Sequence, residues 1–150
     1  MSDAGEIVEL LAFRLGEERF CVDVTAVREL RSWGRPTPLP HAPAYLSGVI
    51  NLRGTILPVL DLATRLGLPP LAGGDRNVII VAEAAGQSAG LIVDAVSDIH
   101  RVERGALEAP PAMASDGQTV CISALSLIGD QMVRVLDLAA LLSTTVVDAA

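Results

Sequence analysis

The stretch Gly48-Val-Ile-Asn-Leu-Arg-Gly-Thr-Ile-Leu-Pro-Val-Leu-Asp-Leu-Ala63 carries the strongest structural signal, because its last five residues occur twice in the chain. Val59-Leu-Asp-Leu-Ala63 returns unchanged as Val135-Leu-Asp-Leu-Ala139, 76 residues later. Each copy follows a strand-like apolar run that begins at a glycine-containing turn. A weaker match precedes it, since residues 20–30 align with residues 89–99 at an offset of 69. Two ordered matches at similar offsets predict a duplicated unit, with repeats at about 7–68 and 77–143.

Short strand patterns separated by turn residues predict a mainly β protein. Four prolines within residues 33–43 predict an extended connection outside any regular ladder, and residues 25–30 fit either a helical turn or a continuing strand. The spacing favours small closed β-barrels over βαβ units. Strands are expected at 7–15, 19–24, 49–52, 55–60 (a tight hairpin about Arg53-Gly54), 77–82, 88–93, 119–127 and 131–136.

Asp61 and Asp137 hold the same place in the two copies, directly before a short helical pattern. A carboxylate in this position accepts backbone N–H bonds from the first helical turn. We interpret both residues as caps of short helices, at 62–66 and 138–142, rather than as an acid–base pair. The remaining segments are expected to be a flexible N-terminus (1–6), a flexible loop (71–75), an irregular link (103–116) and a C-terminal tail (144–150).

The composition bounds both the core and the partners. The chain has 150 residues, of which 51% are hydrophobic and only 3% aromatic, so we expect one domain with one continuous aliphatic core. The net charge is −7, which argues against nucleic acid. All 11 cations are arginine, so the chemistry of Schiff-base and P-loop lysines is excluded. The sequence has no apolar run long enough to span a bilayer and no signal peptide, so a cytoplasmic protein without membrane insertion is expected.

No catalytic or metal-binding constellation emerges from the residues. Cys21 and Cys121 each lie among apolar neighbours and are expected to be reduced, buried thiols, while His41 and His100 are expected to be solvated. Metal-ligand spacings do not occur, and we predict no metal, no cofactor and no enzymatic activity. Arg53 lies at a hairpin tip, where it is either simply solvated or presented to a partner. These features favour a binding module.

Four blocks of the chain closely resemble the CheW family of chemotaxis coupling proteins. The resemblance covers roughly residues 7–143 in order, without the receiver domain of the CheV proteins or the kinase domain of CheA. Its most specific part is the block Gly48-Val-Ile-Asn-Leu-Arg-Gly54. The blocks are residues 13–24, Val27-Arg-Glu-Leu-Arg31, residues 46–62 and residues 90–99.

This resemblance implies a single domain of two pseudosymmetric five-stranded β-barrel lobes with short capping helices. It implies a scaffold that couples the cytoplasmic tip of methyl-accepting chemoreceptors to the regulatory domain of the histidine kinase CheA, recruited to membrane-associated arrays through these partners. The family's receptor-binding groove between the lobes maps onto Leu11, Val22, Thr25, Val27 and Val96. The polar positions that are functionally sensitive in the family map onto Glu29, Gly48, Asn51 and Arg53.

Two alternatives stay open at this point. The chain fits a coupling protein of a non-flagellar, pilus-type chemosensory pathway, which differs from the leading hypothesis only in its partners. A small-ligand-binding or enzymatic domain is the alternative from another class. The absence of lysine, of metal spacing and of a framed nucleophile disfavours that second alternative.

Overall fold

The computed structural model describes residues 5–69, 71, 76–109 and 121–143. Four predicted segments therefore lie wholly or largely outside the described residues, namely the N-terminus, the 71–75 loop, part of the 103–116 link and the C-terminal tail. Within the described part, the fold is mainly β, as predicted. The strands are β1 Ile7–Leu15, β2 Glu18–Asp23, β3 Val27–Ser32, β4 Leu46–Leu52, β5 Thr55–Asp61, β6 Val78–Ala84, β7 Gln87–Val93, β8 Ala95–Glu103, β9 Ile122–Ile128 and β10 Gln131–Leu136.

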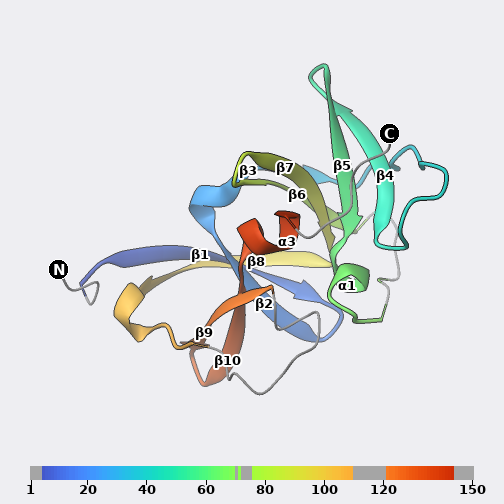
Figure 1. Cartoon of the computed structure of the whole chain (residues 1–150). Coiled ribbons are helices and arrows are strands. Elements are labelled where there is room, and N and C mark those ends of the chain that lie inside the picture. Colours follow the sequence, from blue (N-terminus) through green and yellow to red (C-terminus); the bar gives the residue numbers. More distant parts are fainter. Residues whose placement is uncertain (1–4, 70, 72–75, 110–120, 144–150) are drawn as a thin grey trace.

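The strands form two five-stranded sheets. Sheet A has the order β8-β1-β2-β10-β9, and sheet B has the order β3-β6-β7-β5-β4. Sheet B thus uses five consecutive strands, whereas sheet A combines the first two strands with the last three (Figure 1). Each sheet takes one hairpin from one sequence repeat and three strands from the other, so the two repeats are interlaced. One parallel contact occurs in each sheet, β2 with β10 and β5 with β7.

The chain crosses between the sheets at two equivalent places. After β2, the 3-10 turn Val24–Ala26 leads into β3, so residues 25–30 hold both the helical turn and the strand that the sequence left as alternatives. After β7, the chain returns to sheet A at Asp94, whose backbone N–H donates to the carbonyl of Arg14 at 3.0 Å. The two crossovers therefore mark the junction of the sheets.

Two short α-helices end the two halves of the fold, and both follow the predicted aspartate. Helix α1 (Leu62–Arg65) is capped by Asp61, whose Oδ1 accepts the N–H of Thr64 at 3.2 Å. Helix α3 (Leu138–Ser143) is capped by Asp137, whose Oδ1 accepts the N–H of Ala140 at 3.0 Å. Both cap predictions are confirmed. Helix α3 follows a sheet A strand but contacts β6 and β7 of sheet B, and so ties the sheets together.

The apolar interior is divided into three clusters, whereas the sequence predicted one continuous core. The division arises because β1 is buried on both faces and its side chains alternate between them. Leu11, Phe13 and Leu15 face the large cluster between the sheets, whereas Leu10 and Ala12 face a second cluster inside sheet A. A third cluster, with Val59 and Ile79 among its members, lies within sheet B. The inter-sheet cluster also contains the apolar side chains of α1 and α3.

Candidate coupling surface

The predicted site residue Arg53 lies at the tip of the β4–β5 hairpin. Arg53 and Gly54 both have positive φ, 51° and 87°, which is the type I′ turn that fits the twist of a two-residue hairpin. The Asn51 side chain accepts the N–H of Gly54 at 2.7 Å and so braces the turn. A non-glycine residue in the left-handed region costs about 1–2 kcal/mol. Arg53 is therefore held in a fixed and locally unfavourable position.

The Arg53 guanidinium donates a hydrogen bond to the carboxylate of Glu29, two side chains that the sequence placed 24 residues apart. The Arg53 side chain is 73% exposed, so this ion pair stands at the surface. The Nη1 atom of Arg31 lies 3.8 Å from Oε2 of the same Glu29 carboxylate. The structure therefore brings three of the four polar positions, Glu29, Asn51 and Arg53, to one end of sheet B.

The strand that carries Glu29 contains a β-bulge. Val27 pairs with Ala82 and Glu29 pairs with Val81, so Arg28 is an extra residue opposite no partner. Because a bulge interrupts the alternation of side chains, Arg28 and Glu29 line the same depression. A bulge leaves no mark in a single sequence, so sequence reasoning missed Arg28.

Arg28 adds a second ion pair to this surface, with Glu83 on β6. The Arg28 guanidinium holds the pKa of Glu83 below its ordinary value through a hydrogen bond and its charge, and the Ser88 hydroxyl, which donates to Glu83 at 3.2 Å, acts in the same direction. The depression has a volume of about 440 Å³. We call it, with its rim, the coupling surface, and its lining residues are Arg28, Glu29, Leu52, Arg53, Thr55, Leu57, Val81, Glu83 and Ser88.

Gly48 has a structural role. Its φ is +148°, and a Cβ placed on it would lie 2.2 Å from the carbonyl oxygen of Thr37. That contact exists because Thr37 and Val49 exchange two backbone hydrogen bonds of 2.8 and 2.9 Å. Gly48 thereby lets the proline-rich segment dock on β4, which supports the hairpin from outside.

The five residues mapped onto a groove separate into two groups. Leu11 and Val22 pair directly across β1 and β2, and both are buried in the inter-sheet cluster, Val22 with 0% of its surface exposed. The expectation that Val22 lines an open groove is therefore wrong, because β2 is covered on both faces. Thr25 is exposed, and Val27 and Val96 are half-buried against the same cluster.

The polar side chain of Thr25 helps to hold the crossover turn in place. Its backbone N–H and its hydroxyl both donate to Oδ1 of Asp23, at 2.9 and 2.8 Å. Val27 and Val96 occupy equivalent positions in the two repeats, directly after the two crossovers. The accessible part of the predicted groove is thus Thr25, Val27 and Val96.

The groups able to do chemistry are buried or dispersed. Burial raises the pKa of the Cys21 thiol to about 11, and burial also raises the pKa of Cys121, so neither is an activated nucleophile. His100 was expected to be solvated, but its Nε2 is buried and has no hydrogen-bond partner among the described residues. Across the described ranges, His, Cys, Asp and Glu side chains form no group that could hold a metal ion. No described helix is long and apolar enough to cross a membrane.

Comparisons with known proteins agree with this geometry. The model of the CheW-like domain matches residues 9–146. The probable chemotaxis protein CheW of Rhizobium etli is 45% identical over 142 residues, covering 95% of this chain and 92% of that protein. The chemotaxis protein CheW of Rhizobium meliloti is 52% identical over 108 residues, covering 72% and 70%.

A solved structure shows the same fold. The crystal structure of the scaffolding protein TtCheW from Thermoanaerobacter tengcongensis matches with a TM-score of 0.85 and 31% identity, covering 95% of this chain and 97% of that one. These relatives are named as chemotaxis or scaffolding proteins, and the pilus-type and small-ligand alternatives are not favoured. The chain therefore belongs to the CheW-like family and is a chemotaxis adaptor rather than an enzyme.

Proposed function

We propose that this chain couples methyl-accepting chemoreceptors to the regulatory domain of the histidine kinase CheA in the cytoplasm, and that these partners recruit it to membrane-associated receptor arrays. The observation that carries the proposal is the fixed presentation of Arg53 beside Glu29. Arg53 adopts a left-handed backbone that glycine would adopt without strain, and its guanidinium stands exposed on the surface. Strained residues cluster at functional sites, and here the strained residue carries an exposed charged side chain.

The receptor side is assigned to the accessible groove residues Thr25, Val27 and Val96. Half-buried valines beside the junction of two sheets offer an apolar strip on which the apolar face of a helical hairpin tip can lie. The coupling surface on sheet B, with its arginine and carboxylate pairs, is assigned to signal transfer. Its depression has apolar walls as well, since Leu52, Leu57 and Val81 line it.

The test compares coupling with stability in a reconstituted receptor–kinase assay. Replacing Arg53 by Ala removes an exposed ion pair, which contributes only about 0–1 kcal/mol to folding. A partner-facing charge lost from a binding interface costs about 2–5 kcal/mol, so receptor-dependent kinase activation is expected to fall by about thirtyfold or more at limiting adaptor concentration.

The matched control is Arg104→Ala. Arg104 forms an exposed ion pair with Glu6, at 2.8 Å, just beyond the ends of β8 and β1, and so supplies the same chemistry outside the coupling surface. Activation should remain at the wild-type level in this variant. Equal losses of activation in the two variants, or a collapse of the melting temperature in Arg53→Ala, would show that Arg53 has no specific coupling role.

A further inference from the structure

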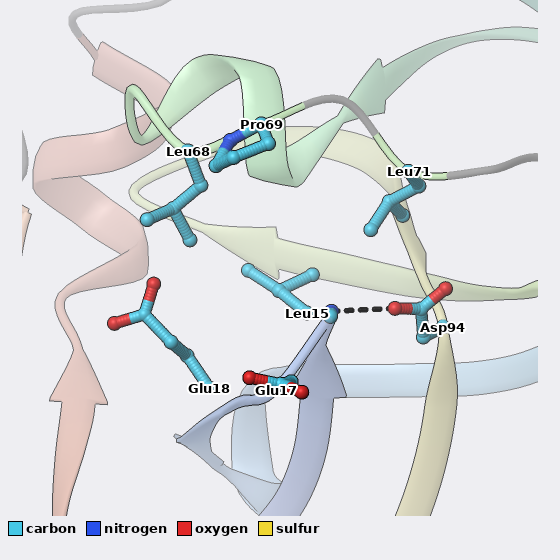
Figure 2. A pocket seen from close by; sticks show the side chains of 8 residues that line it. Leu15, Glu17, Glu18, Leu68, Pro69, Leu71 and Asp94 are labelled. Carbon is cyan, nitrogen blue, oxygen red and sulfur yellow. Dashed lines mark hydrogen bonds between the residues drawn. The ribbon is translucent and has the colours of Figure 1, made fainter.

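A second depression, of about 420 Å³, lies beside the crossover from β7 to β8. Three segments meet there: the β1–β2 turn, the chain after α1, and the crossover from β7 to β8 (Figure 2). Its volume falls within the range of natural ligand sites, about 300–1,000 Å³. The lining residues are Leu15, Gly16, Glu17, Glu18, Leu68, Pro69, Leu71 and Asp94.

The walls of this depression are apolar. Leu15 belongs to the inter-sheet cluster, and Leu68 and Leu71 pack against that cluster from the side while remaining half-buried. Figure 2 shows these three side chains gathered around the cavity with Glu17 and Glu18 at one edge and Asp94 at another. The site therefore offers leucine surface next to carboxylates.

Among the described residues, two of its three carboxylates have no ion-pair partner. Glu18 is neutralised by Arg134, at 2.5 Å. Asp94 accepts the backbone N–H of Gly16, at 2.5 Å, and exposed Glu17 makes no ion pair within the described part of the chain. Arg14 on β1 and Arg19 on β2 are register partners in the sheet. Their side chains alternate to the opposite face from those of Leu15 and Glu18.

The equivalent depression in the other half lacks this free charge. It contains Thr25, which aligns with Asp94 between the repeats, together with Asp23 and Asp137. Asp23 accepts two hydrogen bonds from Thr25, and Asp137 accepts the N–H of Ala140 as a helix cap. The fold itself uses those carboxylates, whereas the Glu17 side chain makes no hydrogen bond or ion pair to the described residues.

We propose that the depression at Leu15, Leu68 and Asp94 is a docking site for a basic segment of a partner protein, in which an arginine is flanked by apolar residues. The aliphatic stem of the arginine lies along half-buried Leu68, above buried Leu15, and its guanidinium binds the carboxylates of Glu17 and Asp94. The apolar neighbour of the arginine covers Leu71. The net charge of −7 favours the encounter with such a segment. This site is separate from the coupling surface, and the proposal does not depend on the coupling function.

The probe is the peptide acetyl-Leu-Arg-Leu-amide, titrated into the isotope-labelled full chain at low salt and followed by backbone amide chemical shifts. Shifts are expected at residues 15–18, at Leu68 and at Asp94. Replacing the peptide's arginine by citrulline, which keeps the shape and removes the charge, should weaken binding by about tenfold or more. Glu17→Gln should do the same, while Glu103→Gln, an equal charge change at an exposed position of β8, should leave the affinity unchanged.

Four outcomes would overturn the proposal. Equal binding of the citrulline peptide would remove the charge from the mechanism, and shifts confined to other residues would move the site. Free arginine amide binding as tightly as the peptide would make the site one for a small guanidinium compound instead of a protein segment. An absence of shifts at millimolar peptide would also contradict the proposal. None of these results bears on Arg53, so the coupling function stands or falls separately.

Discussion

The β4–β5 hairpin of sheet B and the β9–β10 hairpin of sheet A occupy equivalent positions but present different chemistry. Leu52 pairs with Thr55 beside the first turn, as Ile128 pairs with Gln131 beside the second. Arg53 corresponds to Gly129, and both are left-handed, with φ of 51° and 64°. Both hairpin tips therefore have a left-handed residue at this position. It is glycine in sheet A and arginine in sheet B.

The flanks of the tips differ as well. In sheet B, Asn51 pairs with Ile56, which is 64% exposed. In sheet A, the corresponding pair is Leu127 and Met132, which are 61% and 53% exposed. The two hairpins therefore share the tight turn, which the fold needs. Only the β4–β5 hairpin adds a charged side chain, on a residue whose backbone conformation is locally unfavourable.

The largest effect is expected when a charge is introduced at a buried position near the sheet junction, compared with an accessible one. Val22→Glu should prevent folding, because it places an unpaired charge in the inter-sheet cluster, a loss of several kcal/mol. Val96→Glu, at a half-buried edge position, should fold and lose receptor binding. Circular dichroism melts and a receptor pull-down would measure both. A folded Val22→Glu protein, or full receptor binding by Val96→Glu, would break this assignment.

The next effect concerns the support of the first hairpin. Gly48 corresponds to Ala124 in the second hairpin, where Glu108 exchanges two backbone hydrogen bonds with Leu125 as Thr37 does with Val49, but a Cβ is accommodated. Gly48→Ala should cost about 3 kcal/mol in the free energy of unfolding, because the new Cβ would overlap the Thr37 carbonyl in a strained backbone. Ala124→Gly should cost only about 1 kcal/mol. Equal losses measured in urea would refute the structural role of Gly48.

A smaller effect tests how alike the two halves are. Asp61→Ala and Asp137→Ala each remove one cap hydrogen bond, of 3.2 and 3.0 Å, and each should cost about 0.5–2 kcal/mol. Chemical denaturation of the two single variants gives the comparison. A negligible loss in either variant would mean that the repeated aspartate is not a cap in that half, although Val-Leu-Asp-Leu-Ala recurs there.

These caps show what the sequence reveals well. A repeated motif with a capping aspartate identifies local structure, because the cap depends on residues within one turn of it. The tight hairpin at Arg53-Gly54 was predicted for the same reason, and its tip position made Arg53 a candidate. The resemblance to a known family supplied the other candidate site residues, which no local pattern would have identified.

Features that depend on distant segments escaped prediction. The burial of Val22 follows from the packing of β2 between two clusters, and the alternation of one strand cannot reveal that both of its faces are covered. The bulge at Arg28 depends on the register of β3 against β6, and with it the contribution of Glu83 to the coupling surface. The interlaced repeats likewise arise from pairing between β1 and β8.

The most direct test of the central claim is Arg53→Gly, which gives the first hairpin the residue found at the second. The substitution stabilises the fold by relieving about 1–2 kcal/mol of left-handed strain. It destabilises the fold by removing an ion pair of about 0–1 kcal/mol and by raising the entropy of the unfolded chain, which costs about 0.4–1 kcal/mol. The free energy of unfolding should therefore change by less than about 2 kcal/mol, because these terms partly offset one another. Receptor-dependent kinase activation, measured on the same sample, should fall by about thirtyfold or more if Arg53 is held in place for coupling. Unchanged activation in a stable Arg53→Gly protein would contradict the account.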